Sequence, residues 1–77
     1  MKKIQILGTG CAKCNELAAN AQAAALALGA EVEFEKVTAI NDIMKFGVMT
    51  TPGLAIDGKV VSQGKVLSPE QIQKLLR

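Results

Sequence analysis

Apolar and polar positions divide the first half of the chain into a strand, a helix and a second strand. Residues 3–7 form a short apolar-rich run that Gly8-Thr9-Gly10 interrupts, which predicts a buried strand entering a tight loop. Residues 12–28 carry many Ala and repeat apolar positions at helical spacing, and Gly29 supplies a stop. Residues 31–37 alternate, which predicts a strand at a sheet edge.

A short helix is expected next, with Thr38 as its N-cap and Gly47 at its end. Its apolar positions Ile40, Ile43 and Met44 are expected to face the core.

A hairpin and a last helix complete the chain. Residues 54–56 and 59–61 flank Asp57-Gly58, a turn pair that favours antiparallel strands. The segment 68–71 (Ser-Pro-Glu-Gln) predicts a helix start with Ser68 as N-cap, Pro in the first position and Gln in the capping-box position. The apolar face of this helix is expected to be made by Ile72, Leu75 and Leu76.

The order β-α-β-α-β-β-α predicts an α/β fold in which a four-stranded mixed sheet is flanked by three helices on both faces. The chain has no composition break or repeat, so residues 1–77 are treated as one domain.

Composition narrows the classes of partner. The aromatic residues are Phe34 and Phe46 alone, which argues against base stacking on nucleic acid. The formal charge of +2 is scattered along the chain, and no apolar run is long enough to span a bilayer. We therefore expect a cytoplasmic monomer that binds neither nucleic acid nor membranes.

The chain contains no His, which excludes a Ser-His-Asp triad, a Cys-His pair and a histidine metal site. The predicted reactive residues are therefore Cys11 and Cys14, which lie where the first loop becomes the first helix. Residues three apart in a helical turn lie about 5 to 6 Å apart, within reach of a disulfide. The helix start favours a thiolate, and Lys13 adds a positive charge.

The two sulfurs are expected to differ. Cys14 continues the apolar stripe of the helix and should be partly buried, whereas Cys11 stands at the junction where a partner can reach it. Cys11 is therefore assigned as the thiol that attacks a substrate disulfide, and Cys14 as the thiol that resolves the mixed disulfide.

Other interpretations of the pair stay open. The two cysteines could be buried small hydrophobes, or they could hold a soft metal such as copper, or zinc shared between two chains. The domain could also serve as a binding module without catalysis. Gly8-x-Gly10 half-matches a dinucleotide fingerprint, but Lys13 stands where that motif has a third glycine, and we expect no cofactor.

Together these features resemble the thioredoxin-like superfamily, in particular its small, glutaredoxin-sized redox-active disulfide proteins. The resemblance rests on Cys11-x-x-Cys14 and on Thr51-Pro52 directly before the hairpin. It implies a thiol-disulfide oxidoreductase of the electron-transport type, with a cis Thr51-Pro52 bond against the Cys pair. It also implies that the Thr51 backbone is free to pair with an extended substrate, that disulfide-containing proteins are the substrates, and that an unidentified reductase supplies electrons.

The resemblance further implies that Gly64 avoids crowding the site and that Thr50 and Met49 border it. Each of these residues also has a simpler interpretation. Gly64 could form an ordinary bulge, Met49 could pack in the core, and Pro52 could be trans and open an edge strand. The chain departs from the larger families in having Ala12-Lys13 between the cysteines and Gln5 in the strand that carries a buried acid in thioredoxins.

A ferredoxin-like soft-metal carrier also places C-x-x-C after its first strand. That fold runs β-α-β-β-α-β and ends on a strand, whereas the capped segment beginning at Ser68 predicts a final helix here. The order of elements therefore favours the thioredoxin-like fold.

Overall fold

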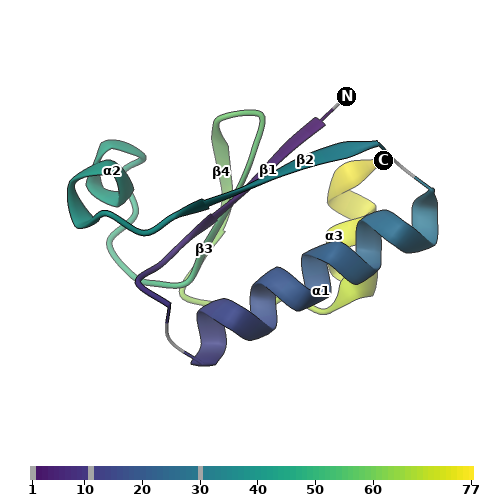
Figure 1. Ribbon diagram of the computed structural model, residues 1–77, viewed down its shortest axis with the longest axis horizontal. Coiled ribbons are helices and arrows are strands. Elements are labelled where there is room, and N and C mark those ends of the chain that lie inside the picture. The colour runs from purple at the N-terminus through teal and green to yellow at the C-terminus, as the bar shows by residue number, and fades with distance from the viewer. Residues whose placement is uncertain (1, 11, 30) are drawn as a thin grey trace.

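The computed structural model describes residues 2–10, 12–29 and 31–77, which form the seven elements shown in Figure 1. In chain order these are β1 (Lys2–Leu7), α1 (Ala12–Leu28), β2 (Val32–Val37), α2 (Ile40–Lys45), β3 (Gly53–Ile56), β4 (Lys59–Gln63) and α3 (Pro69–Leu76). The predicted order is confirmed, and the chain ends on a helix as the thioredoxin-like fold requires. None of the described helices has the length and apolar character needed to cross a membrane.

The four strands form one mixed sheet in the order β2-β1-β3-β4. β1 pairs parallel with β2 and antiparallel with β3, and β3 pairs antiparallel with β4. The second strand therefore lies at an edge, as its alternating sequence predicts. The last residue of β1, Leu7, is paired with Val37 on one side and Gly53 on the other, so the end of this central strand is held from both sides.

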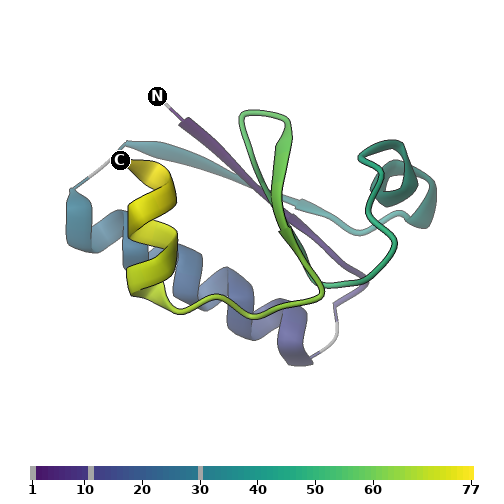
Figure 2. The same ribbon diagram turned by 180° about the vertical axis from the view of Figure 1, so that it is seen from behind.

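The main core lies between the sheet and the pair α1 and α3, which contact each other on the same side of the sheet (Figure 2). Ala21 and Ala24 of α1 are fully buried, and their small side chains let this helix approach its neighbours closely. Aliphatic side chains fill the rest: Ile4, Ile6, Leu17, Leu54, Ile56, Ile72 and Leu76.

A second, smaller cluster lies on the opposite face and is covered by α2, so helices flank both faces as predicted. It contains Leu7, Val37, Ile43, Val48 and Ala55. The helix lies at the end of the molecule far from α3 (Figures 1 and 2). Since α2 has only six residues, it covers one end of this face, and polar side chains occupy part of the remainder.

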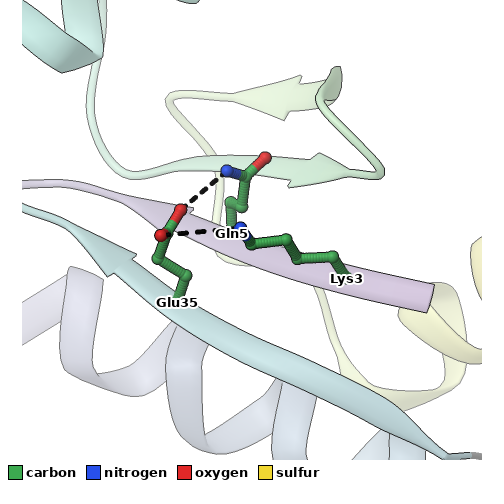
Figure 3. Close-up of polar contacts among 3 residues, drawn as sticks. All are labelled: Lys3, Gln5 and Glu35. Atoms are coloured by element: carbon green, nitrogen blue, oxygen red, sulfur yellow. Dashed lines mark hydrogen bonds and ion pairs between the residues drawn. The ribbon is translucent and has the colours of Figure 1, made fainter. Parts of the chain in front are cut away.

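The polar part of this face is built on the paired positions Gln5 and Glu35 (Figure 3). Gln5 Nε2 donates a 2.8 Å hydrogen bond to Glu35 Oε1, and Lys3 Nζ lies 3.6 Å from Glu35 Oε2. The hydrogen bond from Gln5 and then the charge of Lys3 lower the pKa of Glu35 from its ordinary value. These contacts favour the observed register, because a one-residue slip would move Gln5 to the other face.

The expected cap of α2 is wrong. The N-cap is Ala39, whose backbone is extended and whose carbonyl accepts from the N–H of Ile43 at 3.0 Å, with no side-chain cap. Thr38 instead lies one residue too early. Ile40 and Met44, expected in the core, are 64% and 65% exposed, because a helix this short turns only Ile43 inward.

Both local signals in the last part of the chain are confirmed. Asp57 and Gly58 have φ of 53° and 83°, the positive values that a tight hairpin turn of this kind requires. At α3, Ser68 Oγ accepts from the N–H of Gln71 at 3.3 Å, and the Gln71 side chain accepts from the N–H of Ser68 at 3.0 Å. Leu75, predicted on the buried face of this helix, is 39% exposed.

Candidate active site

Cys14 lies in the first turn of α1 and is buried, with 4% of its surface exposed. It is more completely enclosed than the partial burial predicted, because the helix packs its Cys14, Leu17 and Ala18 positions inward. Cys11, the other member of the predicted pair, lies outside the described residues. Its position three residues earlier in the sequence is what links it to this site.

Gly8, directly after β1, forms the wall against which the Cys14 sulfur packs. A Cβ built on Gly8 would stand well under 3.0 Å from Cys14 Sγ and 3.2 Å from Cys14 Cβ. The same point lies 3.9 Å from the Cα of Pro52, so three separate segments of the chain meet here. The sequence pattern identified Gly8 only as part of a tight loop and missed this contact.

Pro52 enters the site from the loop before β3. The Thr51–Pro52 peptide bond is cis, and the Pro52 side chain is fully buried. The strand that follows is interior to the sheet, so the alternative of a trans proline opening an edge strand is wrong. Thr50 and Thr51 are exposed beside this buried proline.

Gly64, one residue after β4, is hydrogen-bonded to the loop before β3 that contains Pro52. Its N–H donates a 2.8 Å hydrogen bond to the Pro52 carbonyl, and its φ is +73°. A Cβ on Gly64 would lie 2.7 Å from Thr50 Oγ1, so a side chain at this position would press on Thr50. The irregularity of the β3–β4 pairing lies at Leu54 and Ala55, away from Gly64.

Met49 borders the same loop from outside. Its N–H donates a 3.0 Å hydrogen bond to Gln63 Oε1, and 90% of its surface is exposed. The alternative that Met49 fills the core is therefore wrong. Its exposed thioether side chain belongs to the surface next to Thr50.

Beside Cys14 is a small cavity of about 20 Å³. Its lining includes Lys36 near the end of β2, Thr38 directly after that strand, and Asn15 of α1. Lys13, the lysine singled out from the sequence, is exposed on α1 and does not line this cavity. The parallel pairing of Leu7 with Val37 explains why residues 36 and 38 arrive here, and sequence spacing alone does not give that pairing.

A second, wider cavity of about 300 Å³ shares Lys36 and Thr38 with the first and is lined on its other side by residues of α2 that carry both signs of charge, Asp42 and Lys45. These two side chains pair with each other at 3.8 Å. Within residues 2–10, 12–29 and 31–77, no three His, Cys, Asp or Glu side chains are grouped so that they could hold a metal ion.

Comparison with known proteins identifies the family to which the chain belongs. The family model described as a thioredoxin domain matches residues 2–77. A thioredoxin from Methanothermobacter thermautotrophicus is 47% identical over 76 residues, which cover 99% of each chain. A thioredoxin from Methanocaldococcus jannaschii is 43% identical over 77 residues, covering all of this chain and 88% of the relative. The chain belongs to the thioredoxin family.

Proposed function

We propose that this protein is a thiol-disulfide oxidoreductase in which Cys11 attacks a substrate disulfide and Cys14 resolves the mixed disulfide. Membership of the thioredoxin family supports a redox protein of this general class. The finer assignment of roles rests on the different settings of the two cysteines. Cys14 is buried in α1, and Cys11 precedes the helix in the sequence.

The observation that carries the proposal is the meeting of Cys14, Gly8 and Pro52. The sulfur packs against Gly8 next to a buried proline, within a site built from the end of β1, the start of α1 and the loop before β3. Because the Cys14 thiol is buried, it is suited to react with a substrate only after a neighbouring sulfur has formed the mixed disulfide. This suits Cys14 to the second, intramolecular step rather than to the first attack.

The reaction transfers two electrons from the protein to the substrate. The Cys11 thiolate attacks one sulfur of the substrate disulfide, forms a mixed disulfide and releases the first substrate thiolate. The Cys14 thiolate then attacks the Cys11 sulfur, forms the Cys11–Cys14 disulfide and releases the second substrate thiolate. The two protons of the dithiol end on the substrate thiols or in solvent, and an external reductase restores the dithiol.

The exposed residues Met49, Thr50 and Thr51 supply a surface directly before the buried Pro52 on which a protein substrate would lie. The Thr51 backbone would pair with an extended segment of that substrate, and Gly64 keeps the loop in place through its bond to Pro52. Disulfide-containing proteins are therefore the proposed substrates. In this assignment Lys13, exposed on the first turn of α1, adds positive charge near the thiolate.

Single cysteine variants test the roles. Reduced Cys14→Ser protein mixed with a disulfide-containing protein should accumulate a mixed disulfide through Cys11, seen by mass spectrometry and on non-reducing gels. Cys11→Ser should form none and should lose disulfide reduction. Equal residual turnover in both variants would contradict the assignment, as would tight copper(I) or zinc binding by reduced protein that turns over no disulfide.

A further inference from the structure

We propose that Gly8 is a positioning residue for the Cys14 thiol, because the space left by its missing side chain is where the sulfur sits. The inference rests on the proposed function and deepens it. A Cβ at Gly8 would overlap Cys14 Sγ, well under 3.0 Å away, and would come within 3.2 Å of Cys14 Cβ.

Space, rather than backbone freedom, explains the glycine at this position. Gly8 is not among the glycines with positive φ, so its backbone conformation suits an ordinary residue. Gly10 is the opposite case, because its φ is +90° and a Cβ there would meet nothing within 4 Å. Of the two glycines in the loop, Gly10 provides the positive φ that the turn requires, and Gly8 provides the space that the Cys14 sulfur occupies.

The backbone on both sides of this contact is held, so the sulfur is the atom that can move. The N–H of Gly8 donates a 3.0 Å hydrogen bond to the Val37 carbonyl, and the preceding Leu7 is paired to strands on both sides. Cys14 belongs to a helix anchored by the fully buried Leu17. A methyl group at position 8 would therefore turn the Cys14 side chain about its Cα–Cβ bond, and the 3.2 Å contact with Cys14 Cβ would require a further shift of only a few tenths of an ångström.

A displaced sulfur affects one step of the reaction and spares the other. In the resolving step, Cys14 Sγ forms a bond to Cys11 Sγ while the bond from Cys11 to the substrate sulfur breaks, and this exchange requires aligned sulfurs. A misplacement of about 1 Å can slow such a step by about 100-fold. The first attack, by Cys11 on the substrate, does not use the Cys14 sulfur.

Stopped-flow kinetics with a symmetric aryl disulfide, whose thiolate is coloured, separates the two steps. In reduced Gly8→Ala, release of the first thiolate should match the unmodified protein, and release of the second should slow by about 10- to 100-fold. Thr9→Ala, an exposed neighbour in the same loop, should leave both rates unchanged. A second release as fast in Gly8→Ala as in the unmodified protein would overturn the proposal.

A stability measurement tests the position of the sulfur without any redox chemistry. Gly8→Ala should lower the urea midpoint of the reduced protein when Cys14 is present, and this loss should be clearly smaller in a Cys14→Ala background, where Sγ is gone and only the 3.2 Å contact with the Cβ of residue 14 remains. An equal loss in both backgrounds would overturn the proposal. Failure of Cys14→Ser to trap a mixed disulfide would refute the oxidoreductase function instead, and the urea comparison would still decide the role of Gly8.

Discussion

The N–H of Gly64 donates a 2.8 Å hydrogen bond to the carbonyl of Pro52. The residue that follows β4 therefore holds the loop that precedes β3. The bond links the part of the site that lies latest in the chain to Pro52, whose Cα is 3.9 Å from where a Cβ on Gly8 would stand. This hydrogen bond makes the shape of the loop at residues 49–52 depend on Gly64, which has no reactive side chain.

Gly64→Ala should therefore disturb this loop. The positive φ of +73° costs a residue with a Cβ about 1–2 kcal/mol, and the Cβ would also press on Thr50 Oγ1. We expect urea unfolding to show a loss of that order or larger, with weaker turnover of protein disulfides. In a Thr50→Ala background the Oγ1 contact is absent, and the additional loss caused by Gly64→Ala should be smaller. The same loss in both backgrounds would show that Thr50 does not contribute.

The contacts of Glu35 predict a pH dependence of stability. Its pKa is lowered in the folded protein, first by the hydrogen bond from Gln5 and then by Lys3. The ionised form is therefore favoured by folding, and its contribution is present above the ordinary value of 4.5 and is lost as the pH falls through the lowered folded pKa.

Glu35→Gln should accordingly reduce the stability lost between pH 7 and pH 3 in urea titrations. The effect should be small, since Glu35 is exposed to solvent. Glu16→Gln, which removes an exposed carboxylate from α1, serves as the control for the change in net charge. A pH dependence that shrinks equally in both variants would assign the effect to net charge and not to the Gln5 and Lys3 contacts.

The capping box of α3 should contribute measurably to folding. Ser68→Ala removes the acceptor for the N–H of Gln71 and should cost about 1 kcal/mol of unfolding free energy. Ser68→Asp keeps an acceptor at the N-cap and should retain most of the stability. Denaturant unfolding of both variants checks this, and equal losses would mean that the hydrogen bond itself is unimportant.

Two leucines of α1 offer a matched test of the core. Leu17 is fully buried between helix and sheet, whereas Leu26, on the same helix, is 83% exposed. Leu17→Ala should cost about 2–5 kcal/mol, and Leu26→Ala should change stability by no more than about 0.5 kcal/mol. A substantial loss in Leu26→Ala would indicate that this side chain is covered in solution.

Sequence reasoning predicted the elements with strong local signals. The helix predicted from about residue 12 to residue 28 is confirmed as Ala12–Leu28, since its alanine content and helical spacing extend over several turns. The Asp57-Gly58 turn and the Ser68 cap were also correct, because each depends on residues within four positions of one another. The cap of α2 was wrong, since a six-residue helix carries too little pattern to distinguish Thr38 from Ala39.

The amino-acid sequence by itself determined the order of strands and helices, the presence of two cysteines at a helix start and the exclusion of histidine chemistry. These follow from residue types and short-range spacing, which act within a few positions of the chain. Only the tertiary structure decided that the Cys14 sulfur packs against Gly8 and that Lys36 rather than Lys13 lines the adjoining cavity. Those contacts join segments far apart in the chain, and they arise from the pairing of strands, which no local pattern specifies.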